Sequence, residues 1–519
     1  MNRSLLLDQL KEEKTWDFII VGGGATGLGA AVDAASRGYS AILFEQSDLA
    51  KGTSSRSTKL VHGGVRYMAQ GDLALVREAC YERGLLLKNA PHLSKNQTFV
   101  IPNYSFFDNI LYTIGLKFYD MLAGKLSLGR SKFIGKKKTI EYLPTIRQQG
   151  LRGGVVYQDG QFDDARLAVN LAQTAIEQGA CVLNYCRVVN LQKQNKKVCG
   201  VKVKDQETNI EYSVKGKAVI NATGVFVDDL LLMDKPEARK LVKPSQGIHL
   251  VMDRSFLDSE HALMIPKTSD GRVLFAVPWH DKLVTGTTDT VRDHIELEPH
   301  ALEQEINFIL NTAANYLTRK PTRADVLSVF AGLRPLAAPQ TEGKSTKEIS
   351  RNHKIIVSKS NLVTITGGKW TTYRRMAQDV VDRAIAQVHL HYKPCVTKTL
   401  KIHGYRDGVN MHDHLYVYGS DIESVQELMN ESPEFKEKIS TKYDFTKAEV
   451  VWAVRKEFAR NIDDVLARRC RLLFLDAHEA IKAAPVVAQV LARELGRDEA
   501  WIQQQMSEFT TMAKGYILN

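Results

Sequence analysis

Three glycines near the start of the chain have the spacing of a phosphate-binding turn. Gly22, Gly24 and Gly27 form a G-x-G-x-x-G motif, and an acidic residue, Glu45, follows downstream. In such a motif the first glycine permits a tight turn, the second lets the backbone approach a pyrophosphate, and the third lets a helix pack closely on the sheet. The N-terminus of that helix presents free N–H groups and a positive dipole end to the phosphates. The spacing predicts dinucleotide binding, with Glu45 accepting hydrogen bonds from the adenosine ribose.

The elements that must position this motif are present around it. Residues 16–21 are a continuous apolar run typical of a buried parallel strand, and residues 28–36 form a helix of small side chains. Residues 39–44 form a second strand, which ends at Glu45. The alternative is a glycine-rich turn without a ligand, but a strand, a helix and an acid in register favour a complete β-α-β unit.

Later segments indicate which dinucleotide is bound. Three short strands separated by turn residues predict a β-meander: 188–191, 198–204 and 210–214. The meander leads into a buried strand at 218–220 and a turn that ends at Gly224, a pattern typical of flavoproteins with two dinucleotide-binding domains, which favours FAD over NAD. A second turn, Gly367-Gly368, is predicted to open a helix whose N-terminus stabilises the negative charge of reduced flavin.

The remaining chain alternates between strand and helix patterns before it becomes helical. Strands are predicted at 273–277, 282–285, 326–330 and 355–366, and helices at 299–319 and from Gly367-Gly368 through Val380. Thr446 and Glu449 form a capping box, and apolar residues follow it at helical spacing: Val451, Val454, Phe458, Ile462 and Val465. The tail is therefore expected to be a separate helical domain.

Composition sets the broad class of the protein. The chain has 519 residues, of which 44% are hydrophobic and 25% charged, so a disordered, collagen-like or low-complexity protein is excluded. At about 100–200 residues per domain, two to four domains are expected. The net charge of +11 suggests an anionic partner, which is a phosphorylated substrate, nucleic acid or an anionic membrane surface.

Cysteine usage and hydropathy point to the compartment. The six cysteines form no C-x-x-C pair, which argues against a zinc site or a disulfide framework and fits a reducing compartment. Residues 1–14 lack the features of a signal peptide, and no run of about 18 apolar residues occurs. We expect a cytoplasmic protein, or one attached to a membrane from the cytoplasmic side, without a metal site.

Long motifs follow one another along almost the whole chain. They are residues 53–67, 78–93, 163–167, 286–289, 332–336, 367–374 and 454–470. In this order they resemble the signatures of the FAD-dependent, quinone-linked glycerol-3-phosphate dehydrogenases. The resemblance implies an α/β fold of the D-amino-acid-oxidase-like class with two dinucleotide-binding domains, a mixed-sheet substrate domain and an all-helical C-terminal domain. We expect the FAD domain at 1–86, 150–235 and 328–390, the substrate domain at 87–149 and 236–327, and the helical domain at 391–519.

The resemblance also implies a reaction. The family oxidises sn-glycerol 3-phosphate to dihydroxyacetone phosphate by hydride transfer from C2 to flavin N5, and passes the electrons to membrane quinone. A peripheral protein of the inner (cytoplasmic) membrane is expected, and a homodimer by analogy with related bacterial enzymes. The alternatives are a soluble oxidase that uses O2, and a flavoenzyme of the same fold for another 2-hydroxy acid or an amine. A flavin-containing RNA-modifying protein is more remote, because no aromatic-basic RNA motif occurs, and we expect no nucleic-acid partner.

Five side chains of these motifs are implied to face the substrate: Arg66, Tyr67, His249, Arg334 and Lys369. His249 is the expected proton acceptor with Tyr67 as relay or orienter, and the three cations serve the phosphate and the developing alkoxide. Each also has an ordinary interpretation as a structural histidine or tyrosine or a surface cation, and Lys369 as an anchor for FAD.

Further motif residues are expected to line the cofactor: Ser54, Ser55, His62, Gly63, Gly224, Gly332, Gly368 and Thr371. Some flavoproteins of this fold attach flavin covalently through a histidine, but this family generally does not. His62 is therefore interpreted as structural or cofactor-lining.

Residues 106–126 place apolar and aromatic side chains on one helical face beside a basic cluster. The cluster comprises Lys125, Arg130, Lys132, Lys136, Lys137 and Lys138. An apolar face flanked by cations suits adsorption to anionic lipid, where each nearby cation contributes about 1 kcal/mol. The alternative is a core helix followed by a solvated basic loop.

Overall fold

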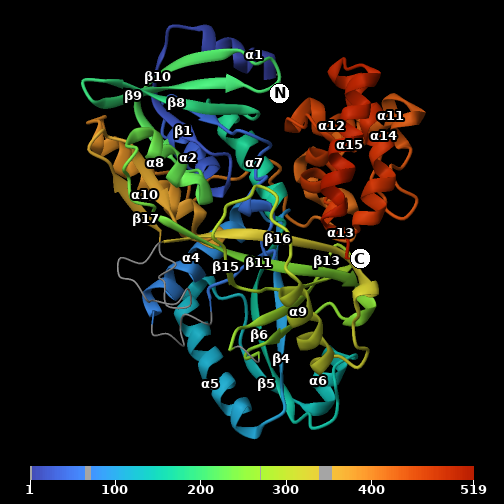
Figure 1. The fold of residues 1–519 in the computed structure, drawn as a ribbon. Helices are drawn as coiled ribbons and strands as arrows, with labels where there is room; N and C mark the ends of the chain where they lie inside the picture. The colour runs from blue at the N-terminus through green and yellow to red at the C-terminus, as the bar shows by residue number, and fades with distance from the viewer. Residues whose placement is uncertain (1–2, 65–71, 269–270, 338–352, 519) are drawn as a thin grey trace.

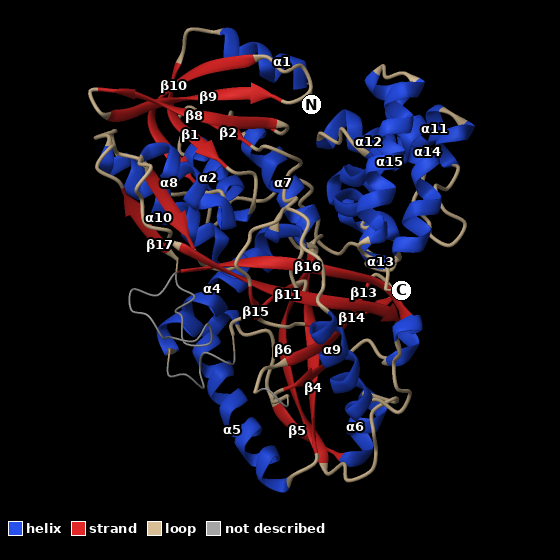
Figure 2. Ribbon diagram, viewed as in Figure 1, coloured by secondary structure: helices blue, strands red, loops and turns tan. Residues whose placement is uncertain are grey.

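The fold consists of two sheets stacked end to end and a helical block beside them (Figure 1). The computed structural model describes residues 3–64, 72–268, 271–337 and 353–518. The chain passes between the two sheets several times before it enters the helical block (Figure 2). The glycine motif lies on the first sheet, whereas many of the side chains expected to surround the substrate lie on the second sheet.

The first sheet is built around a parallel core. Eight strands of the described chain form it: β1 (Thr15–Val21), β2 (Ala41–Phe44), β7 (Cys181–Leu183), β8 (Cys186–Gln194), β9 (Lys197–Asp205), β10 (Glu211–Asn221), β17 (Lys354–Val357) and β18 (Val363–Thr366). β1 lies between β2 and β10, and both pairings are parallel. β8, β9 and β10 are antiparallel neighbours, which confirms the predicted meander.

β1 is apolar from Phe18 to Val21, where both of its faces are buried. Phe18 and Ile20 pack into the main core with three helices: α2 (Ala25–Ser36), α7 (Asp164–Glu177) and α10 (Tyr373–Gln387). Ile19 and Val21 face the opposite way, toward the meander, α8 (Val227–Asp234) and the N-terminal α1 (Arg3–Asp8). The result is a three-layer arrangement of helices, sheet and meander.

The second sheet is largely antiparallel. It contains β3 (Leu60–Val61), β4 (Ser94–Asn103), β5 (Lys132–Gly135), β6 (Gly153–Phe162), β11 (Val242–Asp253), β12 (Ala262–Ile265), β13 (Leu274–Trp279), β14 (Lys282–Gly286), β15 (Thr290–Val291) and β16 (Val326–Ala337). The long strands β11 and β16 pair over almost their full length. Helices α6 (Lys136–Tyr142) and α9 (Glu303–Tyr316) pack on this sheet.

Two further helices pack against one another at the edge of the second sheet. α4 (Leu73–Asn89) packs against α5 (Phe106–Ala123), and α5 extends along the lower end of the molecule (Figure 1). No helix within the described part of the chain is both long enough and apolar enough to span a bilayer.

The C-terminal block is helical, as predicted. Its helices are α11 (Ile422–Glu431), α12 (Lys447–Glu457), α13 (Leu472–Leu475), α14 (Ala477–Leu495) and α15 (Glu499–Lys514), with a π-helical turn at Asp464–Arg469. Thr446 and Glu449 form the expected capping box of α12. The block shares one continuous hydrophobic core with the helices of the first sheet.

Three element predictions need correction. The predicted strands 210–214 and 218–220 are one strand, β10, because its first half pairs with β9 and its second half with β1. α12 does not continue through Ile462, because Phe458 takes a left-handed conformation with φ of 61° and ends the helix. Strand 326–330 continues as β16 to Ala337, because it pairs with β11 along this whole length.

Two helix and strand ends also differ. The helix predicted to open at Gly367-Gly368 begins at Tyr373, after a 3-10 turn at Trp370–Thr372. The segment predicted as one strand at 355–366 is a hairpin of β17 and β18. The two glycines at 367 and 368 both have positive φ, of 79° and 84°, which a helical residue does not adopt.

Candidate active site

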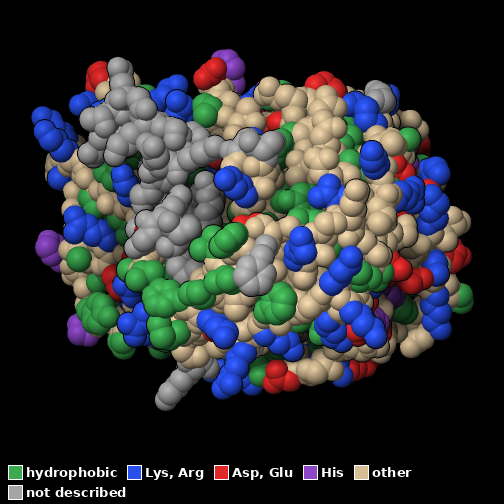
Figure 3. Space-filling view, turned by 90° about the horizontal axis from the view of Figure 1, so that it is seen from below, with side chains coloured by type: hydrophobic (Ala, Val, Ile, Leu, Met, Phe, Trp, Pro, Cys, Tyr) green, Lys and Arg blue, Asp and Glu red, His purple; other side chains and the backbone are tan. Residues whose placement is uncertain are grey.

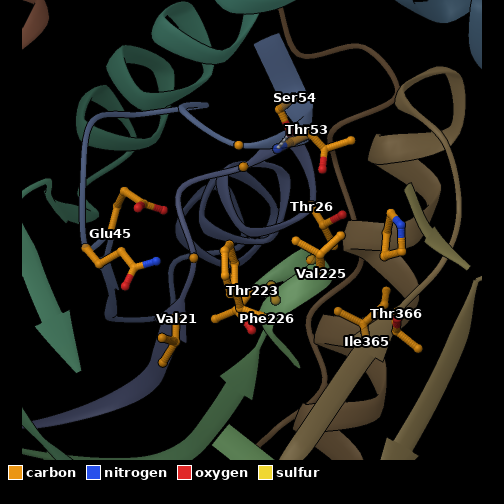
Figure 4. Close-up of a pocket in the computed structure, with 18 of the residues that line it drawn as sticks. Val21, Thr26, Glu45, Thr53, Ser54, Thr223, Val225, Phe226, Ile365 and Thr366 are labelled. Atoms are coloured by element: carbon orange, nitrogen blue, oxygen red, sulfur yellow. Dashed lines mark hydrogen bonds between the residues drawn. The ribbon is translucent and has the colours of Figure 1, made fainter. Parts of the chain in front are cut away.

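A cavity of about 720 Å³ lies at the carboxyl ends of the parallel strands of the first sheet. Val21, Phe44 and Thr366, which end β1, β2 and β18, all contribute to its wall. The carboxyl edge of such a sheet is where dinucleotides bind in this type of fold. Figure 4 shows side chains from several separate segments converging on this space.

The glycine motif forms the floor of this cavity. Gly22 has a φ of 113°, and a Cβ atom on it would lie 2.6 Å from the carbonyl oxygen of Ala222. A Cβ on Gly27 would lie 1.9 Å from the carbonyl oxygen of Gly22, so only glycine lets α2 pack this closely. Gly24 precedes α2 and lines the cavity. The turn and packing roles expected of Gly22 and Gly27 are thus present.

Ser54 and Glu45 organise the same turn from two sides. The hydroxyl of Ser54 accepts a hydrogen bond of 3.0 Å from the backbone N–H of Ala25 at the start of α2. The carboxylate of Glu45 accepts from the N–H groups of Gly23, at 2.6 Å, and Ser47, at 2.9 Å. Burial raises the pKa of Glu45, and these N–H donors oppose the rise. Glu45 lines the cavity, and its contact with a ribose remains a prediction.

A second cavity, of about 280 Å³, adjoins the first. Four residues line both of them: Thr53, Gly368, Lys369 and Trp370. The walls of the smaller cavity include His62, His249, Gly332, Arg334 and Thr371 together with the apolar side chains of Phe99, Met264 and Phe275. Residues far apart in the chain thus meet where a dinucleotide site opens into a smaller, partly apolar chamber.

His249 is a buried member of this second wall. It lies on β11 with 2% of its surface exposed, and its ring stacks on Phe330 of β16 with centroids 4.8 Å apart. Its Nε2 lies 2.9 Å from the hydroxyl oxygen of Thr58, and its Nδ1 has no hydrogen-bond partner within the described residues. Burial, followed by repulsion from Lys59 and Arg334, holds the pKa of His249 well below its ordinary value. The imidazole is therefore neutral near pH 7 and able to accept a proton.

Arg334 projects from β16 beside this histidine. Its Nη2 donates to the hydroxyl of Thr287 at 2.9 Å, and its Nη1 lies 3.3 Å from both the carbonyl oxygen of Gln246 and the carboxylate of Asp289. The side chain is 23% exposed, so part of the guanidinium faces the cavity. These contacts hold the guanidinium at the chamber wall, where its positive charge suits an anion such as a phosphate.

Lys369 and Thr371 follow the second glycine turn, Gly367-Gly368, and also line the smaller cavity. The hydroxyl of Thr371 accepts from the backbone N–H of His62 at 3.2 Å and donates to the His62 carbonyl oxygen at 3.3 Å. This exchange ties the segment that contains His62 to the turn at Trp370–Thr372. Lys369 therefore lies at the junction of the two cavities, next to the segment that carries His62.

Comparison with known proteins identifies the family. Residues 17–382 match the family described as FAD dependent oxidoreductase, and residues 358–502 match the C-terminal domain of alpha-glycerophosphate oxidase. The probable mitochondrial glycerol-3-phosphate dehydrogenase of Caenorhabditis elegans is 40% identical over 98% of this chain and 74% of its own length. The human mitochondrial glycerol-3-phosphate dehydrogenase is 38% identical over 97% of this chain and 74% of its own length. The chain belongs to the FAD-dependent glycerol-3-phosphate dehydrogenase family.

A solved structure of the same family has the same fold. The glycerol-3-phosphate dehydrogenase of Bacillus halodurans, solved as a complex with FAD, is 29% identical and superposes with a TM-score of 0.81. The superposition covers 99% of this chain and 97% of that one. The predicted fold class and the recognition of this dehydrogenase family are thus confirmed, the C-terminal helical domain included.

FAD is the cofactor of this family, and the larger cavity fits it. The close approaches at Gly22 and Gly27 leave backbone N–H groups at the start of α2 for a pyrophosphate, while Gly224 and Ser54 complete the wall. Within the described residues, Ser55 and Gly63 line neither cavity. The backbone N–H of Gly63 donates to the Tyr119 hydroxyl at 2.9 Å, one layer behind the cavity wall.

Two residues implied by the family motifs lie outside the described residues: Arg66 and Tyr67. Other members of the site were missed from the sequence. Asp289, the carboxylate beside Arg334, occurs in the motif 286–289 that supports the family resemblance, so this motif was the available signal. Asp159 and Arg272 also line the smaller cavity. Nothing in the sequence marks them as site residues, because each is a lone charged residue on or beside a strand.

Proposed function

We propose that this chain oxidises sn-glycerol 3-phosphate to dihydroxyacetone phosphate and delivers the electrons to a membrane quinone. The observation that supports this proposal most is the junction of the two cavities. The smaller chamber carries a neutral histidine, His249, and two cationic side chains, Arg334 and Lys369, where it opens into the dinucleotide site. A small phosphorylated alcohol has the matching chemistry, which is an anionic end for the cations and a hydroxyl for the histidine.

The chain's own residues divide the work of this oxidation. FAD, when bound, supplies the acceptor for the hydride that leaves C2. His249 takes the proton of the C2 hydroxyl at Nδ1, the ring nitrogen without a partner within the described residues. Arg334 binds the phosphate through its fork, and Lys369 adds a point charge at the junction. Phe99, Met264 and Phe275 exclude water from the reacting carbon.

The decisive experiment is anaerobic mixing of the FAD-loaded protein with glycerol 3-phosphate. We expect the flavin absorbance to bleach, whereas glycerol, lactate and glycine leave it unchanged at the same concentration. Glycerol is the matched control because it lacks only the phosphate. Bleaching by lactate or glycine, but not by glycerol 3-phosphate, would refute the substrate and favour another oxidoreductase of the same fold.

The electron acceptor is tested separately after reduction. We expect a quinone analogue to reoxidise the bleached flavin rapidly and O2 to do so slowly. Fast turnover with oxygen alone, with formation of peroxide and no response to quinone analogues, would instead identify an oxidase.

The lower end of the molecule supports contact with a membrane. The outward face of α5 exposes large apolar side chains, notably Phe107 at 81% and Leu111, Ile114 and Met121 at 65% each. The neighbouring β5 and α6 expose a second set, made of Phe133 and the cations Lys132, Lys136, Lys137 and Lys138. Seen from below, hydrophobic side chains gather beside Lys and Arg on this face (Figure 3). This combination suits adsorption onto an anionic bilayer surface.

We accordingly propose a peripheral protein of the cytoplasmic face of the inner membrane. The apolar stripe of α5 lies in the interface, and the cations of α6 contact anionic headgroups. The relatives named above are mitochondrial dehydrogenases by name. The homodimer implied by the family resemblance stays a prediction.

A further inference from the structure

Lys59 is a fully buried cation one layer behind the substrate chamber. Its ammonium group donates to both carboxylate oxygens of Asp164, at 2.8 and 2.9 Å, and to the carbonyl oxygen of Ser55 at 2.7 Å. Its relative exposure is 0%. These three contacts use all three N–H donors of the ammonium, so Lys59 does not bind the substrate directly.

The same ammonium and the proposed proton acceptor both lie against the ring of Phe330. The Nζ of Lys59 is 5.2 Å from the centre of the Phe330 ring, and that ring stacks on the imidazole of His249 at 4.8 Å. The preceding residue, Thr58, places its hydroxyl oxygen 2.9 Å from Nε2 of the same histidine. Adjacent residues of one segment thus act on His249 in two ways, one by a hydrogen bond and the other by charge.

The backbone at Lys59 is held in an unfavourable conformation. Its φ is 62°, in the left-handed region that is strained for a residue with a side chain. The surrounding structure holds this turn, because the Lys59 N–H donates to the Ser57 hydroxyl at 3.0 Å and its carbonyl accepts from the Phe162 N–H at 3.0 Å. The conformation directs the ammonium into the protein.

We propose that Lys59 is a positioning residue that keeps the imidazole of His249 neutral, and therefore able to accept the substrate proton, by charge repulsion next to the shared Phe330 ring. The proposal rests on the assignment of His249 made in the proposed function. It assigns no contact with substrate or FAD to Lys59. Its physical basis is that two like charges in a buried, poorly screened region disfavour one another.

The electrostatics of the surrounding groups agree with this role. The charges that lower the pKa of His249 belong to Lys59 and Arg334, in addition to burial. Burial and Arg471 lower the pKa of Lys59 itself to about 7. As the pH falls, Lys59 therefore takes up its proton before His249 does, and its charge then opposes protonation of the imidazole.

Other charged groups surround this pair on every side. Asp164 is shared by Lys59, the Ser57 hydroxyl and Arg471, whose Nη2 lies 3.0 Å from it. Asp163 lies beyond, 3.7 Å from Nε of Arg471 and paired with His280. On β16, Arg334 faces Asp289. The remaining charged or titratable groups of the chamber wall are Arg56, His62, Tyr157, Asp159, Arg272 and Lys369.

The test compares two replacements of Lys59 in the FAD-loaded, full-length protein. Anaerobic stopped-flow mixing with glycerol 3-phosphate gives the rate constant of flavin reduction divided by the substrate dissociation constant, as a function of pH. In Lys59→Gln we expect the acidic limb of this profile to move up by about one pH unit, because the repelling charge is gone. In Lys59→Arg the charge is kept, and the limb should coincide with that of the wild type. The substrate phosphate titrates identically in all variants, so the difference belongs to the protein.

Three outcomes separate this proposal from the one on which it rests. If the acidic limb of the pH profile is unmoved in Lys59→Gln but abolished in His249→Asn, the role proposed for Lys59 is wrong and that of His249 stands. If His249→Asn keeps both the limb and the activity, the assignment of His249 in the proposed function is wrong. A wild-type limb at or above the ordinary histidine pKa of about 6.5 overturns the role of Lys59 even when Lys59→Gln does not retain FAD.

Discussion

Gly247 and Arg334 lie on the paired strands β11 and β16 with no room for a further atom between them. A Cβ atom on Gly247 would stand 2.1 Å from Nη2 of Arg334 and 2.5 Å from the hydroxyl oxygen of Thr287. These are the two groups that hydrogen-bond to one another in the chamber wall. The orientation of the proposed phosphate-binding cation thus depends on a glycine of the neighbouring strand.

Gly247→Ala is expected to displace the guanidinium while leaving the cofactor site intact. We predict that kcat/KM for glycerol 3-phosphate falls at least about tenfold, mostly through a higher KM, since a misplaced cation binds the phosphate less well. Arg334→Ala should cause a larger loss with FAD retained. Gly135→Ala on β5, where no heavy atom lies within 4 Å of the added Cβ, is the matched control. Equal kcat/KM in Gly247→Ala and the control would show that the contact is irrelevant.

Gly27→Ala is expected to abolish FAD binding. Its Cβ would lie 1.9 Å from the Gly22 carbonyl oxygen, so α2 must move away from the glycine turn, which we expect to hold the pyrophosphate. The measurement is the ratio of 450 nm to 280 nm absorbance of the purified protein. Gly135→Ala is the control, because Gly135 lines neither cavity and no heavy atom lies within 4 Å of the added Cβ. Full FAD content in Gly27→Ala would mean that the helix tolerates this displacement.

The exposed face of α5 is expected to govern membrane binding. Leu111→Asp together with Ile114→Asp places two charges on the apolar stripe, and we predict that co-sedimentation with anionic phosphatidylglycerol vesicles falls at least about tenfold. The bleaching by glycerol 3-phosphate in solution should be unchanged. Ile210→Asp, at a similarly exposed apolar side chain in the turn between β9 and β10, should leave vesicle binding intact. Loss of binding in both variants would point to a general charge effect.

The ion pairs of His403 are expected to stabilise the folded protein at acidic and neutral pH and to be lost at alkaline pH. His403 bridges Glu177 of α7, at 2.5 Å, and Asp421 in the C-terminal block, at 2.7 Å. Burial opposes the charge of His403, but the two carboxylates outweigh burial and raise its pKa to about 9. Because the folded-state pKa lies above the unfolded value of about 6.5, the stabilisation is complete below pH 6.5 and is lost as the pH rises through 9.

The corresponding variant is His403→Gln. We predict that it lowers the free energy of unfolding by about 2–3 kcal/mol at pH 6 and by little at pH 10, measured by urea unfolding. His478→Gln, at an exposed histidine of α14, is the control and should show no such pH-dependent difference. A destabilisation of His403→Gln that is the same at both pH values would mean that the histidine acts by packing.

The sequence alone was sufficient for the parts of the molecule that contiguous residues determine. β1, the glycine turn and α2 follow from a local apolar run, from three small residues and from the helix that begins after them, and the meander follows from turn residues between short apolar segments. The capping box of α12 is equally local. The family followed from the order of long motifs, and relatives that match 97–98% of this chain confirm it.

Tertiary structure decided where these local elements end and which distant side chains meet. β10 and β16 are longer than predicted because β10 pairs with β1 through the gap between the two predicted segments, and β16 pairs with β11 as far as Ala337. The surroundings of His249 come from β11, β16 and the segment at Thr58-Lys59, with Asp164 and Arg471 behind them. No periodicity links these residues, because burial of their charges and the contacts between them arise only when the two sheets and the helical block pack together. The sequence thus determined the fold class and the glycine turn at the larger cavity, and the packing decided the electrostatics of the chamber.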